Sequence, residues 1–290
     1  MNTSNFSMYK TALLAFVFFA LLQPAHAATS RIALVIGNAD YQSLEPLKSP
    51  VNDARAMYWV LKEDLNFKVI YAENANQWKM ERALIKFKAL LVSERQRGNE
   101  TVGLFYYSGH GAQYGDENYL LPVAIDTAGN LETIFSSETI ALSSVLDGMK
   151  EANATMNIVI LDACRNNPFS KGGFKSGSKS VGKGLAWVDN TSSEDSMVPQ
   201  GSFIAYATAP NRVAFDDGKA KYSPYTRNLL KYIRKRDMSI EKMFKLVRNA
   251  VIEETNNQQV PWESSSLKGE FFFAGKEKKE TLRLRSGGFR

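Results

Sequence analysis

The sequence predicts an α/β protein: a three-layer sandwich in which helices flank a mostly parallel, six-stranded sheet. Two observations support this fold class. Short β-branched apolar runs alternate along the chain with longer segments of helical period. Turn residues follow the apolar runs. Parallel strands need crossover connections, which are normally helices, so this alternation favours a sheet covered on both faces.

The first predicted strand is 31–37 (RIALVIG), which ends at a glycine and is too short for a typical helix. We expect it to be a central, buried strand. Five further runs have the same character, and they are 67–71, 101–107, 156–161, 202–208 and 270–274.

Segments with apolar residues at helical spacing separate these strands. The predicted helices are 53–62, 77–94, 143–152, 224–235 and 239–254. The alternation is interrupted at 166–200, which is rich in Gly, Ser and Lys and poor in apolar residues. This composition predicts a long exposed loop between two halves of one sheet.

Residues 1–27 have the features of a secretory signal. Lys10 precedes the uncharged apolar run 11–22, and Ala25-His26-Ala27 has the small-x-small pattern that a signal peptidase accepts. The alternative is an uncleaved anchor, but the run is shorter than the ~20 residues that span a bilayer. We therefore expect an exported protein, periplasmic or secreted, without a stable membrane span after cleavage.

The remaining chain is long enough for one large domain, although its length also allows two small ones. We expect a single domain, 28–274, followed by a basic tail, 275–290. The formal charge of +6 is concentrated in the tail and in 171–183. These segments lack the interleaved aromatic pattern of a nucleic-acid platform, so we interpret them as solvated and expect no nucleic-acid partner.

The chain contains one Cys and two His, and His26 lies in the segment expected to be removed. The mature protein then keeps one cysteine, Cys164, and one histidine, His110. A lone thiol cannot form an internal disulfide, so an exported chain either buries it or uses it. A zinc site would need more ligands of this kind, and we expect no required cofactor.

Both residues follow predicted strands. His110 lies in 106–111 (YYSGHG), after the strand that begins at Thr101, and Cys164 lies in 161–165 (LDACR), after the strand that begins at Met156. The carboxyl ends of parallel strands are where ligands bind in open α/β sheets. If the two strands are neighbours, about 4.8 Å apart, His110 and Cys164 share one cleft.

This pair suits nucleophilic catalysis, because a thiolate attacks and an imidazole moves the proton. Gly109 and Gly111 flank the histidine and allow close approach of the backbone to a ligand. We expect the amides of Gly111 and Cys164 to bind an oxyanion. The alternative is a buried structural thiol and a satisfied polar histidine. It is weakened by the location of both residues at strand ends.

These motifs resemble those of the caspase-like cysteine peptidases. The segment 107–111 (YSGHG) is similar to their histidine motif and 162–165 (DACR) to their cysteine motif, with the His about 50 residues before the Cys. Similarity extends over 31–274 and includes 51–54 (VNDA) and 202–226, which contains ATAP and SPYT. The resemblance implies a caspase-like fold, cysteine endopeptidase activity, and a division into a large part, 28–165, a linker, 166–200, and a small part, 201–274.

The sequence resembles the metacaspase and bacterial branch most, because Asp162 stands where animal caspases have Gln. Alternation along a strand places Asp162 on the same face as Cys164, and Asp53 matches a second acidic pocket residue of metacaspases. Two carboxylates imply protein or peptide substrates cleaved after Arg or Lys. The alternatives are a helix-dipole role for Asp53 and a structural acceptor role for Asp162. Asp216 is expected near the groove or in a turn before a glycine.

The linker carries Lys171, Lys175, Lys179 and Lys183, which a basic-directed enzyme would cut in itself. Some relatives are activated by calcium, but the sequence has no strong Ca²⁺ loop. One departure from the caspase pattern is Asn166, where that pattern has Gly. Two other function classes remain: an inactive binding or scaffold module, and a nucleotide binder. The second is disfavoured because no glycine-rich loop follows the first strand.

Overall fold

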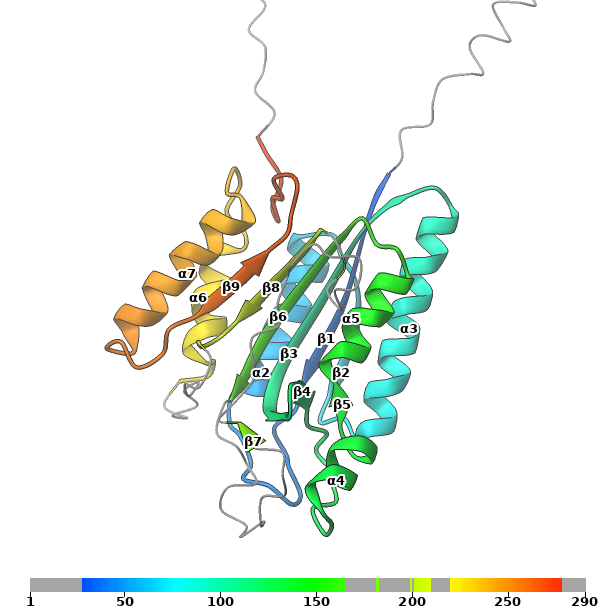
Figure 1. Cartoon of the computed structure of the whole chain (residues 1–290). Helices are drawn as coiled ribbons and strands as arrows, with labels where there is room; N and C mark the ends of the chain where they lie inside the picture. Colours follow the sequence, from blue (N-terminus) through cyan, green and yellow to red (C-terminus); the bar gives the residue numbers. More distant parts are fainter. Residues whose placement is uncertain (1–27, 165–180, 183–198, 200, 210–219, 278–290) are drawn as a thin grey trace, which may run out of the picture.

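The computed structural model describes residues 28–164, 181–182, 199, 201–209 and 220–277 (Figure 1). One sheet runs through this part of the chain, with helices on both faces. The main path of the sheet has the strand order β2-β1-β3-β6-β8-β9. These strands are β1 (Thr29–Gly37), β2 (Lys68–Glu73), β3 (Glu100–Tyr114), β6 (Met156–Cys164), β8 (Ser202–Tyr206) and β9 (Trp262–Ser265). All neighbours on this path are parallel except β8 and β9, which confirms the predicted fold class.

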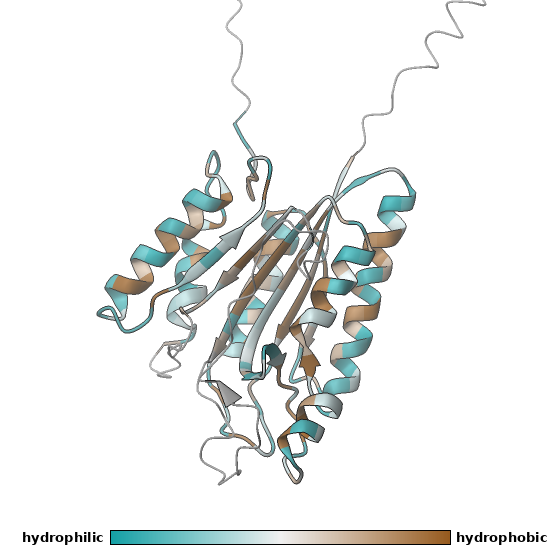
Figure 2. Cartoon of the chain, viewed as in Figure 1, coloured by the Kyte–Doolittle hydropathy of each residue, from teal (hydrophilic) through white to brown (hydrophobic). Residues whose placement is uncertain are grey.

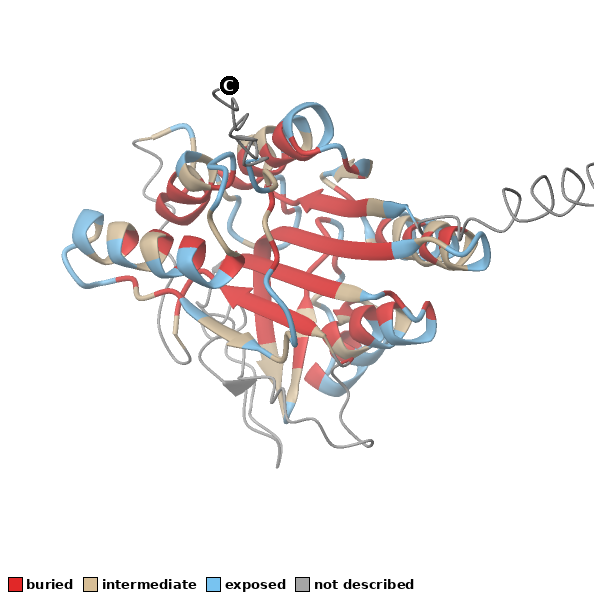
Figure 3. Ribbon diagram, turned by 90° about the horizontal axis from the view of Figure 1, so that it is seen from above, coloured by how far each residue is buried: buried red, intermediate tan, exposed pale blue. Residues whose placement is uncertain are grey.

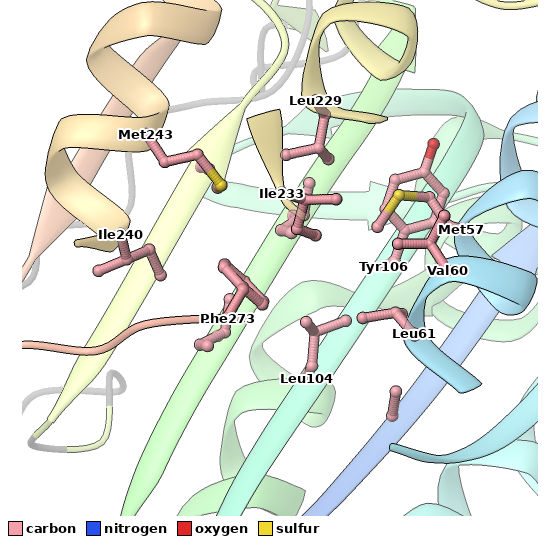
Figure 4. Close-up of a cluster of buried hydrophobic side chains, with 14 of the residues drawn as sticks. Met57, Val60, Leu61, Leu104, Tyr106, Leu229, Ile233, Ile240, Met243 and Phe273 are labelled. Atoms are coloured by element: carbon pink, nitrogen blue, oxygen red, sulfur yellow. The ribbon is translucent and has the colours of Figure 1, made fainter. Parts of the chain in front are cut away.

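The described helices form two layers on the sheet and a separate group around α4. They are α2 (Pro50–Trp59), which continues into the π-helical turn η1 (Val60–Asp64), α3 (Gln77–Gln96), α4 (Leu131–Ser137), α5 (Leu142–Glu151), α6 (Pro224–Tyr232) and α7 (Ile240–Glu254). Helices α2, α6 and α7 pack on one face of the sheet, and α3 and α5 pack on the other. Figure 4 shows part of the first layer, where Met57 of α2, Tyr106 of β3 and Leu229 of α6 belong to one buried cluster.

The central strands are buried on both faces, which explains their continuous apolar sequences. In β3, Leu104 and Tyr106 pack into the cluster under α2, α6 and α7, whereas Phe105 and Tyr107 pack under α3 and α5. The strands are accordingly apolar in Figure 2 and buried in Figure 3. Alternating burial of this kind fixes the register, because a shift of one residue would exchange the two faces.

Strand β3 is longer than the sequence predicts. The prediction that it ends at Tyr107, with His110 beyond its end, is wrong, because the strand continues to Tyr114. Its last residues pair with the antiparallel strands β4 (Glu117–Leu120) and β7 (Val181–Gly182), and β4 also pairs with β5 (Ile140–Ala141). With α4, these short strands lie beyond the carboxyl ends of β1 and β6 (Figure 1). Cys164, also predicted to follow its strand, is the last residue of β6.

The prediction that 270–274 forms the last strand is also wrong. This segment contributes only an isolated bridge between Phe272 and Ser239, and the last strand is β9. The Phe271 and Phe273 side chains instead enter the core. The Arg31 guanidinium donates hydrogen bonds to the carbonyl oxygens of Phe273, at 2.6 Å, and Phe272, at 3.3 Å. Apolar content therefore reflects burial here, not strand pairing.

Across the described ranges, every helix is too short or too polar to span a lipid bilayer. The predicted signal, 1–27, lies outside the described residues, as do most of 166–200 and residues 278–290 of the tail.

A substitution at the end of β1 tests the contact between this strand and α2. A Cβ atom on Gly37 would lie 2.5 Å from the Ala54 Cβ atom and 2.5 Å from the Pro50 carbonyl oxygen. Gly37→Ala should therefore lower the free energy of unfolding by about 1–3 kcal/mol, because overpacking displaces the helix. The measurement is urea denaturation.

Gly148→Ala in α5 is the matched control, since its Cβ would find only the Lys88 Cδ atom, at 4.0 Å. It should leave stability unchanged or raise it by up to about 1 kcal/mol, because alanine is the better helix former. Equal stability of the two variants would contradict the close packing of α2 on β1.

Candidate active site

His110 and Cys164 lie opposite each other on neighbouring strands. The parallel register of β3 and β6 pairs Tyr106 with Ile160, Ser108 with Asp162 and His110 with Cys164. Adjacent strands are about 4.8 Å apart, so the main chains of His110 and Cys164 are immediate neighbours. The expectation that the two strands are adjacent is confirmed, and the sheet brings the two residues to one edge.

A backbone carbonyl holds the imidazole of His110. The side chain is buried, with 6% of its surface exposed, and its Nε2 atom lies 2.8 Å from the carbonyl oxygen of Glu45. A carbonyl oxygen only accepts hydrogen bonds, so Nε2 carries the hydrogen in this arrangement. The neutral ring then takes up a proton at Nδ1, which makes Nδ1 the basic nitrogen of the site.

Main-chain pairing sets the direction of the Gly111 amide. The Leu121 N–H donates to the His110 carbonyl oxygen at 3.1 Å, and Gly111 stands opposite Leu120. This combination makes Gly111 and Leu120 a non-hydrogen-bonded pair, whose amides point away from the partner strand. The Gly111 N–H is therefore directed away from β4 and toward the side of β3 on which β6 ends.

Two buried carboxylates lie beside this edge, and Ser223 links them. The Ser223 N–H donates to Asp53 Oδ1 at 3.0 Å, and its hydroxyl donates to Asp162 Oδ2 at 2.5 Å. Asp53 is fully buried and Asp162 is 6% exposed. The Ser108 hydroxyl lies 3.4 Å from Asp53 Oδ2, and the Thr226 hydroxyl donates to Asp162 Oδ2 at 2.7 Å. The structure thus brings together the two acids that the sequence singles out.

Burial and the nearby acids raise the pKa values of two tyrosines beside this pair. Burial raises the pKa of Tyr106 well above its ordinary value, and the charges of Asp53 and Asp162 raise it further. Burial likewise raises the pKa of Tyr225, with Asp162 as the next cause. The hydrogen bonds that each carboxylate accepts compensate for part of its lost hydration.

Ser223, Thr226 and Ser108 are site residues that sequence reasoning missed. Ser223 is the N-cap of α6: its hydroxyl accepts a hydrogen bond from the Thr226 N–H, and Pro224 occupies the first turn. The Ser-Pro pair signals a helix start. Nothing local in the sequence shows that the same hydroxyl reaches Asp162, which lies on β6.

Several predicted residues remain untested. Asp216 and the four linker lysines lie outside the described residues, and the oxyanion role of the Gly111 and Cys164 amides stays a prediction. Where the structure describes side chains, no three His, Cys, Asp or Glu residues gather as ligands for a metal ion.

Replacing Ser223 tests the link between α6 and Asp162. Ser223→Ala removes both a helix cap and a hydrogen bond to a buried carboxylate, so it should lower the free energy of unfolding by about 3 kcal/mol. Thermal or urea denaturation measures the loss.

Ser239→Ala is the control, because Ser239 caps α7 through a 3.4 Å bond from the Lys242 N–H. Losing this cap alone should cost about 1 kcal/mol or less. Losses of equal size in both variants would show that the Asp162 contact adds nothing.

Comparison of the sequence with known proteins identifies the family of the chain. Residues 30–272 match the family model of the caspase domain, Peptidase_C14. The chain is also 29% identical over 138 residues to the human mucosa-associated lymphoid tissue lymphoma translocation protein 1, and equally so to its mouse homolog. These matches cover 48% of this chain and 15% of each relative. The chain therefore belongs to the caspase-domain family of peptidases.

Proposed function

We propose that the chain is an exported cysteine endopeptidase that cleaves protein or peptide substrates after Arg or Lys. The observation that carries the proposal is the register that pairs His110 with Cys164. Membership of the caspase-domain family supports a peptidase-type function. The cleaved bond and the roles of individual residues are inferred from the chemistry of the site.

The first half of the reaction forms a thioester. His110 Nδ1 takes the thiol proton of Cys164, and the thiolate attacks the carbonyl carbon of the substrate. The carbonyl oxygen becomes an oxyanion, which the Gly111 and Cys164 amides bind. The imidazolium then gives its proton to the leaving amine as the C–N bond breaks.

In the second half, water replaces the amine. His110 Nδ1 takes a proton from the water, which attacks the thioester, and the Cys164 sulfur leaves with the proton returned by the imidazolium. The Glu45 carbonyl keeps its hydrogen bond from Nε2 throughout and holds the ring in one orientation.

The acidic pair selects the side chain before the cleaved bond. Asp53 and Asp162 are both buried and share Ser223, so an arriving cation neutralises two carboxylates at once. A guanidinium group fits best, because its planar fork donates to several oxygens, whereas an ammonium group acts as a point charge. An acidic substrate side chain would add a third negative charge and be excluded.

Catalysis is tested with a fluorogenic peptide that ends in Arg. Cys164→Ala should lower kcat at least about 1,000-fold, because the nucleophile is lost. Absence of turnover by the wild type in reducing buffer, with and without calcium, would contradict the proposal and favour the scaffold alternative.

Specificity is tested by neutralising the acids one at a time. Asp53→Asn and Asp162→Asn should each lower kcat/KM for the Arg peptide about 30-fold or more, since a buried charge partner is lost. Asp147→Asn, an exposed position on α5, is the control and should change nothing. An undiminished preference for Arg in both site variants would exclude the acidic pair as the specificity pocket.

Export and self-cleavage are tested by mass spectrometry of the protein expressed with residues 1–27. The wild type should begin at Ala28, because a signal peptidase cuts after Ala27. It should also be cut after one or more of Lys171, Lys175, Lys179 and Lys183, whereas Cys164→Ala should stay uncut between 166 and 200. Cuts that persist in Cys164→Ala would assign the processing to another protease.

A further inference from the structure

Tyr41 holds the main chain of His110 through its hydroxyl. The His110 N–H donates to the Tyr41 hydroxyl oxygen at 2.7 Å. That hydroxyl also lies 3.2 Å from the Leu121 carbonyl oxygen, to which it donates, and 3.3 Å from the Tyr107 hydroxyl. Tyr107 completes the arrangement by donating to the His110 carbonyl oxygen at 2.7 Å. Two buried phenols therefore fix both polar groups of the His110 main chain.

The ring of Tyr41 also packs on the imidazole. The two ring centroids are 4.4 Å apart, and the ring planes meet at 52°. Tilted aromatic pairs at this separation attract each other beyond simple burial, and a phenol ring also favours a neighbouring cation. The phenol ring of Tyr41 is thus placed to restrict the rotation of the His110 imidazole in both of its protonation states.

Tyr41 and Glu45 act on His110 from a single loop. Tyr41 contacts the imidazole ring, and the Glu45 carbonyl oxygen accepts from Nε2. The loop is itself fixed, because the Gln42 N–H donates to the Val123 carbonyl oxygen at 2.9 Å and the Leu47 N–H to the Ala39 carbonyl oxygen at 3.0 Å. Only 4% of Tyr41 is exposed, and it packs into the cluster around α4.

The glycine before His110 is explained by the same contact. A Cβ atom on Gly109 would lie 2.7 Å from the Tyr107 hydroxyl oxygen and 2.8 Å from the Tyr41 hydroxyl oxygen. A side chain here would separate the two phenols from the His110 main chain. The Ser-Gly-His-Gly sequence therefore leaves room for tyrosine hydroxyls, a role different from the ligand approach expected of this glycine.

We propose that Tyr41 is a positioning residue of this site, which acts through His110 by fixing its main chain and orienting its imidazole. This inference rests on the proposed function, because the orientation matters only if His110 exchanges a proton with Cys164. Tyr41 lies on the loop after β1, whereas Asp53 and Asp162 accept hydrogen bonds from Ser223, the N-cap residue of α6. Replacing Tyr41 should therefore leave substrate binding intact.

Two variants separate the hydroxyl from the ring. Tyr41→Phe keeps the ring and should lower kcat for the Arg peptide about tenfold, whereas Tyr41→Leu removes both contacts and should lower it about 100-fold, because a misoriented base loses most of its effect. KM should stay within about twofold in both variants, since the interaction serves the chemical step. Tyr119→Phe, a half-buried phenol on β4, is the control and should match the wild type.

A second readout does not depend on proteolysis. Cys164 is the only cysteine of the chain, so the rate of alkylation by iodoacetamide reports this thiol alone. Tyr41→Phe should slow alkylation at neutral pH several-fold, and Tyr41→Leu should slow it further, toward the rate of His110→Ala. If the wild type cleaves no peptide, the proposed function fails, and the alkylation rates alone test the role of Tyr41.

Wild-type kcat and wild-type alkylation in Tyr41→Phe and Tyr41→Leu would overturn the proposal. A parallel rise of KM and fall of kcat, with unchanged alkylation, would also overturn it, because that pattern indicates general loosening of the domain. If Tyr41→Leu does not fold, the kcat and alkylation rate of the conservative Tyr41→Phe variant decide between these outcomes.

Discussion

The parallel pairing of β3 with β6 is the constraint on which the site depends. One main-chain register places His110 opposite Cys164 and Ser108 opposite Asp162. A slip of one residue would move every side chain of a strand to the other face, and burial on both faces opposes such a slip. The apolar core therefore does more than stabilise the domain, because it also fixes the alignment of a base, a thiol and an acid across two strands.

The buried acids show how the fold compensates for a costly arrangement. Asp53 and Asp162 come from α2 and β6, and both accept hydrogen bonds from Ser223, at the positive end of α6. Helix α6 is thus tied to the two acids by polar groups as well as by its apolar face. Ser223 thereby couples α6 to α2 and β6 at the site itself.

Much of this organisation follows from the sequence, because short-range patterns encode it. Continuous apolar runs predict the parallel strands, and the single Cys and the one His outside the predicted signal segment indicate one edge of the sheet. The extension of β3 to Tyr114, the location of β9 and the contacts of Tyr41 and Ser223 did not follow. Each depends on a partner distant in the chain. The polar strand Trp262–Ser265 has little apolar signal, whereas the nearby Phe271 and Phe273 enter the core.

The proposed catalysis at this edge requires that the imidazole of His110 and the sulfur of Cys164 work together on two adjacent strands. A crystal structure of the protein with a peptide aldehyde that ends in Arg tests this requirement most directly. We expect a covalent bond from Cys164 to the aldehyde carbon, its oxygen at the Gly111 amide, His110 Nδ1 facing the adduct, and the guanidinium between Asp53 and Asp162. An adduct with His110 turned away, or an aldehyde that does not react with Cys164, would contradict it.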